Sequence, residues 1–397
     1  FRNAALNNKK VDKGQSAGGR IRAIYLPSDN WKFDFNVSYE YGDQGGYPYG
    51  LYNKETGDVA KTAYNDESSY YRNLLNAGLN VEYQAQNFTL SAVTGYQHLK
   101  DRMFLDQDFT AKNTYTLEQK QRINTISEEI VMKSKESHRW QWATGIFGFY
   151  QWLNTTAPVT FKEDGMAMMD QMLGNFIPAL VEVPMGPGRN MNIMPALKVT
   201  SARLPINGDF KTPLLNGALF HQSTFRDLFG IDGVSFTAGL RLDYEKMKMD
   251  YNSGTAMDYT IGITGQMMMN GAPTGKPISM MPETALTVTS RYQGSISKDY
   301  LQLLPKFALQ YDFPKNLGNV YATVSKGYRS GGYNIQMFSD LLQASLKNDM
   351  MRLTKDEIMS QVPENLKDMV NFIPDAGENP DARAATVYKP EQTWNYE

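Results

Sequence analysis

The chain has 397 residues, no cysteine and three histidines, and its 40 basic and 42 acidic residues leave a formal net charge of -2. This near balance argues against a nucleic-acid binder, which is normally basic, and the lack of cysteine excludes disulfides, zinc ribbons, iron–sulfur ligation and thiol catalysis. No stretch reaches the roughly 18 consecutive apolar residues that a transmembrane helix needs.

Alternation of apolar and polar residues with period two dominates the chain and predicts β-strands. Residues 31–42, WKFDFNVSYEYG, place six apolar or aromatic side chains on one face and five polar ones on the other, and residues 234–245, VSFTAGLRLDYE, alternate likewise. In chain order, we predict about eleven strands, at 17–26, 30–42, 72–85, 88–100, 119–135, 138–152, 215–227, 232–246, 299–313, 318–329 and 392–397. Most of them match or exceed the roughly 9–11 residues that cross a bilayer at a tilt.

The connections between these strands alternate in length. Tight links are expected at 27–30, 86–87, 136–137, 229–233 and 314–318. Long loops are expected between them, at 43–71, 101–118, 154–214, 247–298 and 330–391. In an up-and-down meander every second connection lies at the same end, so all long loops share one rim. This arrangement is typical of an antiparallel outer-membrane β-barrel with short periplasmic turns and long extracellular loops.

The two faces of the predicted strands fit a barrel wall, with one apolar face for lipid and one polar face for the lumen. Aromatic side chains recur near both strand ends, for example Trp31 and Trp140 beside short turns and Tyr41 and Tyr244 beside long loops. Such placement predicts two interfacial girdles, although aromatic residues are enriched in strands of any kind.

Four segments resemble the barrel of a TonB-dependent outer-membrane receptor. They are residues 127–152, which begin SEEIVM, the segment FTAGLRLDYE at 236–245, residues 303–333, which include VSKGYRSGGY, and YKPEQTWNYE at 388–397. The resemblance covers the strands and not the long loops. It implies a barrel of about 22 strands, of which this chain supplies about eleven, filled by an N-terminal plug.

The resemblance also implies a function, namely active import of a scarce nutrient across the outer membrane of a Gram-negative bacterium. The expected cargo is a ferric siderophore, haem or another iron complex, and the expected partners are the TonB complex acting through the plug, membrane lipid and a surface lipoprotein. No cofactor, metal site or nucleic-acid partner is expected. Because the chain starts at Phe1 without an initiator methionine and ends within a predicted strand, we expect an internal piece that lacks the plug.

Inward-facing polar residues are the first candidates for a site, because Arg suits anionic ligands. The ligand-binding candidates are Arg241, Arg329, Lys306, Tyr328 and Tyr333, and the residues expected to face the lumen or plug are Glu82, Asp243 and Asp312. The alternation places Tyr328 with Val320 and Val324 on the lipid face. His98 is also expected there, as a solvated rim residue rather than a haem ligand.

Methionine gathers in the three longest loops, which contain 20 of the 22 Met residues by our count. Methionine serves either as an adaptable ligand surface or as filler between packed elements, and the sequence favours filler. Helices are predicted at 166–181, at 355–362 behind a capping box formed by Thr354 and Glu357, and at 363–372. These folded loops either bind a ligand or simply cap the barrel mouth.

Three other functions remain open: a passive porin-type channel, an adhesin or structural barrel, and a barrel enzyme. Enzyme motifs such as G-x-S-x-G, H-E-x-x-H and the P-loop are missing from the sequence. Adjacent carboxylates such as Glu128 and Glu129 point to opposite faces of a strand and cannot act as an acid–base pair.

Overall fold

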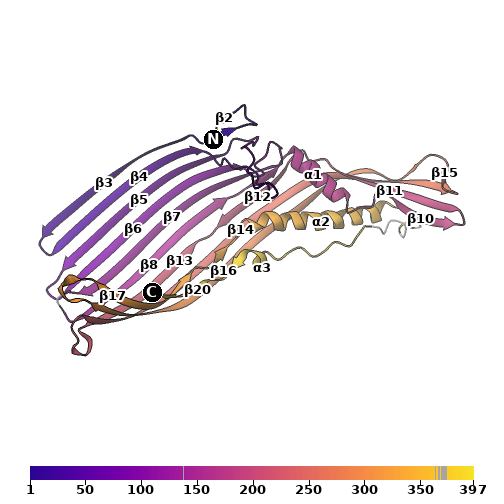
Figure 1. Cartoon of the computed structure of the whole chain (residues 1–397). Coiled ribbons are helices and arrows are strands. Elements are labelled where there is room, and N and C mark those ends of the chain that lie inside the picture. Colours follow the sequence, from indigo (N-terminus) through magenta and orange to yellow (C-terminus); the bar gives the residue numbers. More distant parts are fainter. Residues whose placement is uncertain (137, 363, 365–366, 368–372) are drawn as a thin grey trace.

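The computed structural model describes residues 1–136, 138–362, 364, 367 and 373–397. In these ranges the main element is one strongly curved antiparallel sheet of 16 strands, with a long arm at one end (Figure 1). The expected all-β, antiparallel architecture is therefore confirmed. None of the helices in these ranges combines the length and apolar character needed to span a membrane.

Eleven strands form a continuous wall in which each pairs with the next along the chain. They are β3 (Gly14–Ser28), β4 (Trp31–Gly45), β5 (Ser69–Gln84), β6 (Phe88–Asp106), β7 (Tyr115–Ser134), β8 (Trp140–Thr156), β13 (Leu214–Arg226), β14 (Val234–Met269), β16 (Ile278–Asp312), β17 (Asn319–Arg329) and β20 (Glu391–Tyr396). This meander contains all eleven predicted strands in the predicted order.

The tight turns lie at one end of the wall, as predicted. Two of them contain short 3-10 segments, η1 (Leu228–Gly230) and η2 (Pro314–Asn316). After η1 the backbone of Gly233 takes a φ of +83°, and a Cβ there would meet the carbonyl of Asp312. Glycine is needed at this position because other residues rarely adopt such a φ and have no room there.

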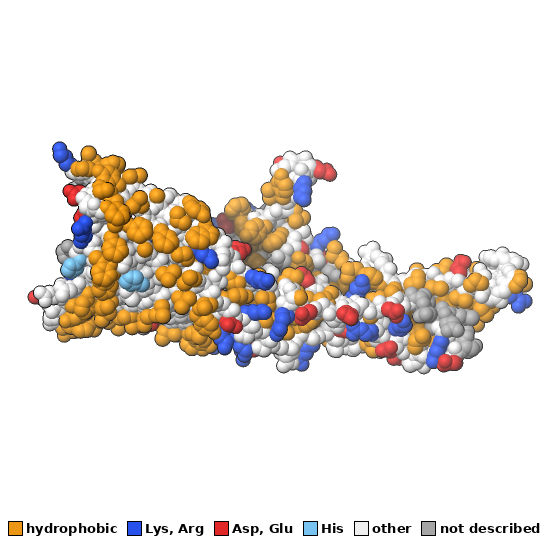
Figure 2. Space-filling model, turned by 90° about the horizontal axis from the view of Figure 1, so that it is seen from below, with side chains coloured by type: hydrophobic (Ala, Val, Ile, Leu, Met, Phe, Trp, Pro, Cys, Tyr) orange, Lys and Arg blue, Asp and Glu red, His pale blue; other side chains and the backbone are white. Residues whose placement is uncertain are grey.

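The outer face of the wall is apolar and exposed, and Figure 2 shows it as a dense hydrophobic field. On β14, Leu240 is 49% exposed, and Leu303 and Phe307 on the neighbouring β16 are similarly exposed. These large side chains share one face because they alternate with polar residues along their strands. A continuous exposed apolar face of this kind suits contact with lipid.

The wall continues into an arm, because β14 and β16 are far longer than their predicted ends at residues 246 and 299. The two strands stay paired from Val234 and Tyr311 out to Gly265 and Ile278. The segment 247–298, predicted as a loop, is therefore a β-hairpin. The arm also contains β10 (Val181–Gly186), β11 (Arg189–Val199) and β15 (Ala272–Pro273), which pair along it (Figure 1).

The apolar face of β14 changes side where the arm begins. Up to Glu245 the inner face carries Arg241 and Asp243, whereas beyond it six of the odd-numbered positions are apolar and buried. Those positions are Met247, Met249, Met257, Tyr259, Ile261 and Ile263. The outer face then becomes polar, with Lys248 and Asp250 in an ion pair. This switch is expected where a strand leaves lipid for water, since the apolar side must then be covered by protein.

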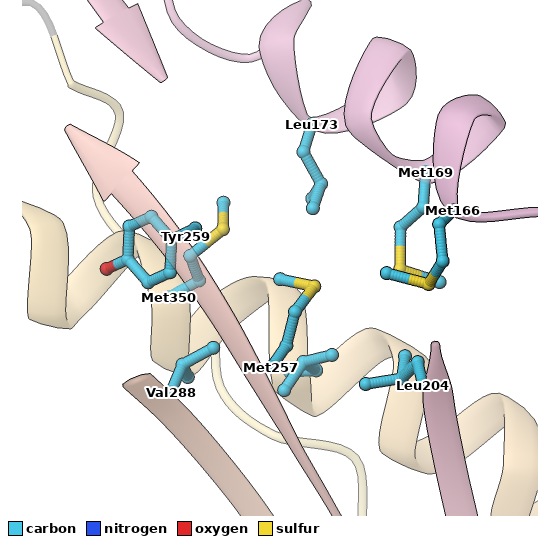
Figure 3. Close-up of a cluster of buried hydrophobic side chains, with 9 residues drawn as sticks. Met166, Met169, Leu173, Leu204, Met257, Tyr259, Val288 and Met350 are labelled. Carbon is cyan, nitrogen blue, oxygen red and sulfur yellow. The ribbon is translucent and has the colours of Figure 1, made fainter. Parts of the chain in front are cut away.

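Helices provide that cover on the inner face of the arm. They are α1 (Glu163–Gly174), α2 (Met337–Gln361) and the short α3 (Ala382–Thr386). Figure 3 shows Met166, Met169 and Leu173 of α1 projecting toward Met257 of β14, with Met350 of α2 in the same cluster. Methionine is therefore a packing residue here, as the sequence favoured.

Two helix predictions were inaccurate. The capping box at Thr354 was wrong, because α2 starts at Met337 and Thr354 is buried inside it. The Thr354 hydroxyl forms a 2.8 Å hydrogen bond with the Tyr259 hydroxyl of β14. Thr354 therefore joins α2 to the arm and does not cap a helix. The helix predicted at 166–181 is shifted, because α1 ends at Gly174. The helix predicted at 363–372 lies mostly outside the described residues.

The remaining short strands lie in the loops. They are β1 (Arg2–Asn3), β2 (Lys9–Lys10), β9 (Val159–Phe161), β12 (Leu204–Lys211), β18 (Gly332–Tyr333) and β19 (Val387–Tyr388). Four of them form two separate two-stranded sheets, β1 with β2 and β18 with β19. The other two, β9 and β12, fill the space between β7, β8 and the start of the arm. They form part of the mouth at the long-loop rim.

Candidate functional site

A buried carboxylate, Asp243, organises the polar inner face of the wall. It is 3% exposed and accepts three hydrogen bonds. Arg241 Nε donates to Oδ2 at 2.8 Å, while Asn216 Nδ2 and the Tyr328 hydroxyl donate to Oδ1 at 2.5 and 2.8 Å. The three donors come from β14, β13 and β17, so the contact links strands far apart in sequence.

Arg241 is further enclosed by two aromatic rings. Its guanidinium carbon lies 5.6 Å from the ring centre of Phe147 and 5.7 Å from that of Phe220, within cation–π range. The Phe220 ring fills the space that a side chain at Gly145 would need. With its charge paired to Asp243 and two rings beside it, Arg241 is held as part of the wall.

The chain segment that begins at the end of β17 crosses the inner wall. Pairing of β17 with β16 ends at Ser325, and the Ser330 hydroxyl then donates to Glu245 Oε2 at 2.5 Å. Farther along, the Tyr333 hydroxyl lies 3.2 Å from the carbonyl oxygens of Met247 and Ile296. We refer to residues 328–335 as the crossing segment.

The prediction that Tyr328 faces lipid was wrong, because its hydroxyl reaches Asp243 on the inner side. Strand alternation fixes a face only while a strand stays in its ladder. Beyond Ser325, β17 has left β16 and pairs only with β20, so its two faces are no longer set by those of the wall. Tyr328 and Tyr333 are thus both inner-wall anchors of the crossing segment.

The other predicted inward residues are scattered and do not meet at one place. Lys306 lines an open cavity of about 600 Å³ with Ser325 and Asn395 near β20. Arg329 is exposed and faces Glu391 in register. The two remaining lumen candidates bond locally: Glu82 accepts from Gln84 at 2.5 Å, and Asp312 accepts from Gln310 at 2.7 Å beside a turn.

His98 lies on the outer face near the long-loop rim, where the sequence placed it. Its Nδ1 lies 2.7 Å from Asn124 Oδ1 on the neighbouring strand. Within the described ranges, no group of three or more His, Cys, Asp or Glu side chains is arranged to hold a metal ion.

A pocket of about 580 Å³ opens at the mouth, between the upper inner wall and the start of α2. We call it the mouth pocket. Its volume falls in the range of small-molecule sites, roughly 300–1,000 Å³. Its wall is mainly apolar and aromatic, with Tyr115, Phe161, Phe210 and Phe338 among the lining residues.

The polar groups of the mouth pocket are mostly uncharged. Besides the Tyr115 phenol, four carboxamides and two serine hydroxyls line it, from Gln107, Gln119, Gln336, Gln343, Ser253 and Ser339. Asp340, at the rim in the first turn of α2, is the one charged side chain among the lining residues that the structure describes.

The electrostatic environment of this pocket is negative. Burial raises the pKa of the Tyr115 phenol, and the nearby carboxylates of Asp108, Asp106 and Asp340 raise it further. Negative charge around a phenol disfavours its anion, which explains the direction of the shift.

Sequence reasoning missed the mouth pocket, because its lining comes from five strands and a helix that lie inside predicted loops or at strand ends. One sequence pattern could have pointed to it. Leu204, Ile206 and Phe210 alternate with polar residues and are buried along β12, and this period-two pattern inside a predicted loop indicates a strand with a packed face.

The family model described as TonB dependent receptor-like, beta-barrel matches residues 3–397. No curated protein matches the chain in sequence. Among solved structures, the chain is similar to the ferric yersiniabactin uptake receptor FyuA from Yersinia pestis, with a TM-score of 0.56 and 15% identity over 100% of this chain and 44% of that one. The chain therefore spans less than half the length of that receptor.

Two further solved structures show weaker similarity. The ferric citrate transporter FecA gives a TM-score of 0.31 and 9% identity, over 80% of this chain and 66% of that one. The ferripyoverdine receptor of Pseudomonas aeruginosa gives 0.29 and 8%, over 80% and 61% of the respective chains.

Proposed function

This chain belongs to the TonB-dependent receptor β-barrel family, and on that premise we propose that it is part of an outer-membrane receptor that imports a ferric siderophore or another iron complex. The ligand enters at the mouth and passes along the polar inner wall. Import is driven by the TonB complex acting on a plug inside the barrel. The family is one of receptors, and we propose no bond-making chemistry for the chain.

The observation that supports this function most directly is the mouth pocket above a polar inner wall. The pocket joins groups from both the wall and a long-loop helix, so a bound ligand would contact the wall and α2 at once. A receptor that passes its cargo inward requires this continuity between the binding surface and the lumen.

Deletion of the gene tests the proposal. A strain without it should lose growth on at least one ferric siderophore or haem supplied as the single iron source, and plasmid-borne full-length protein should restore that growth. Unchanged growth on every iron source would contradict the import of an iron complex. Fractionation of the same cells should recover the protein in the outer membrane.

A passive channel is the second candidate function, because the crossing segment lies on the inner wall, where a porin has its constriction loop. The two candidates differ in conductance. A plugged receptor in a planar bilayer should show no steady open current, whereas a channel should show one. A stable open conductance of the full-length protein would favour the channel.

We also propose a surface lipoprotein as a partner. The arm places paired strands well beyond the wall, and Met185, Met269 and Ile278 near its end are 42–56% exposed. Co-purification of one lipoprotein with the full-length receptor, lost on removal of the arm, would support such a partner.

A further inference from the structure

Resting on the proposed function, we infer that the mouth pocket selects electrically neutral or positively charged ferric complexes with amide or hydroxamate surfaces, and discriminates against anionic ones. The first observation is the charge of the pocket. Asp340 lies at its rim, and Asp106 and Asp108 lie close enough to influence Tyr115 in its wall. An anionic complex bound here would sit beside uncompensated negative charge.

Four cations are adjacent in sequence to lining residues. Lys162, next to Phe161, is paired with Asp66 at 2.5 Å, and Lys211, next to Phe210, is exposed at the end of β12. The other two lie on the other face of the wall. Arg102 and Lys120 flank the lining residues Met103 and Gln119, so strand alternation directs them outward. Both bond Glu118 there, at 2.5 and 2.9 Å. Their charges are thus paired, and they are not aimed at a ligand in the pocket.

Two arginines of the inner wall below the pocket are paired as well. Arg241 is paired with Asp243, and Arg72 with Glu40. Paired arginines lose much of their attraction for a free anion, because a nearby carboxylate already balances their charge. The sequence-based expectation that Arg241 holds an anionic siderophore is therefore not favoured by its surroundings.

The uncharged polar groups fit a ligand rich in amides. A carboxamide donates and accepts hydrogen bonds at once, and four glutamines face this pocket. The Gln343 amide nitrogen is anchored to Ser339, at 3.2 Å to the carbonyl and 3.3 Å to the hydroxyl, which leaves its own carbonyl oxygen as an acceptor. The aromatic walls add apolar contact for the carbon framework of such a ligand.

The test compares iron-55 uptake from three chemically different complexes in cells that carry the full-length receptor. The probes are a neutral ferric trihydroxamate, the singly positive ferric complex of desferrioxamine B, and anionic ferric citrate. Wild-type receptor should take up the neutral or the positive complex in preference to the anionic one. Preference for ferric citrate would overturn the inference, while uptake of none of these complexes or of haem would overturn the proposed function together with it.

Charge reversal at Asp340 tests the role of the pocket's own charge directly. Asp340→Lys should lower uptake of the positive complex about three- to tenfold and raise that of ferric citrate, as expected for a partly screened charge near the ligand. Asp356→Lys makes the same change on an exposed part of α2 outside the pocket and should have no effect. Equal effects of the two variants would overturn the inference.

A second variant guards against a local folding effect, because a negative residue in the first turn also stabilises a helix. Gln119→Lys places the new charge on β7, inside the pocket and away from α2. It should shift the preference in the same direction as Asp340→Lys. No shift from either variant, with surface expression unchanged, would overturn the inference.

Discussion

A charge on the outer face of β14 should destabilise the folded wall much more than the same charge on its inner face. Leu240 is 49% exposed on the outer, apolar face. Along β14 it lies between Val234 and Tyr244. Val234 pairs with Tyr311 of β16 near the tight turns, so Tyr311 and Tyr244 lie at opposite ends of this stretch. These aromatic residues mark the two expected girdles.

The geometry places Leu240 near mid-membrane. Ten residues separate positions 234 and 244, which at about 3.3 Å per residue is about 33 Å along the strand. A tilt of about 45° reduces this to roughly 23 Å across the membrane, close to the apolar band of about 25 Å in such barrels. Position 240 then lies within about 3 Å of the centre of that band.

Arginine at such a depth costs about 2–4 kcal/mol, so Leu240→Arg should lower the free energy of unfolding by that amount. Thr237→Arg on the inner face should cost less than about 1 kcal/mol beyond the loss of its 2.8 Å hydrogen bond to Thr224. Leu240→Ala separates the loss of leucine from the burial of charge.

Denaturant unfolding of the full-length protein refolded in lipid vesicles, followed by tryptophan fluorescence, measures these differences. Equal destabilisation by Leu240→Arg and Thr237→Arg would refute the assignment of the two faces. Equal values for Leu240→Arg and Leu240→Ala would show that position 240 does not contact lipid at mid-depth.

Three other predictions concern packing and pH. Met350→Ala should cost about 2–5 kcal/mol in the same unfolding assay, because Met350 is 1% exposed, whereas Met168→Ala at a 57% exposed site should change stability by less than about 0.5 kcal/mol. Gly145→Leu should cost about 1–3 kcal/mol by displacing the Phe220 ring, and Phe220→Leu in the same chain should recover part of that loss. Burial raises the pKa of the Asp106 carboxyl, so the folded state binds this proton more tightly than the unfolded chain does. The adjoining loop should therefore resist proteolysis better as the pH falls through that raised pKa toward the ordinary value of an aspartate. Asp106→Asn should remove this pH dependence, and a dependence that persists in the variant would show that another group causes it.

Within the wall the sequence alone was sufficient for the fold. A strand between lipid and a polar lumen must alternate, so segments such as 31–42 and 234–245 reveal both the strand and its faces. The tight turns between strands were also recoverable, because Pro, Gly and Asn gather there, as at 314–318. These signals are local, and no distant contact is needed to interpret them.

The arm shows where local signals stop being sufficient. Met247, Met249 and Met257 alternate with polar residues just as Leu240 and Leu242 do, yet the apolar side faces inward there. Alternation reveals a strand but not which side lies against protein, lipid or water. Which side is buried was decided by α1 and α2, which pack over the inner face and lie far from β14 in sequence.

The candidate site depended on tertiary structure for the same reason. Arg241 and Asp243 could be placed on the inner face from the sequence, but the partners that hold Asp243, Asn216 and Tyr328, come from other strands. The mouth pocket joins strand ends to the first turns of α2, and its negative character follows from Asp340 meeting the wall. The sequence by itself determined strands, their order and the lipid face, because these follow from a period repeated along one segment. Only the tertiary structure decided which side chains meet at the mouth, because that depends on contacts between segments more than a hundred residues apart.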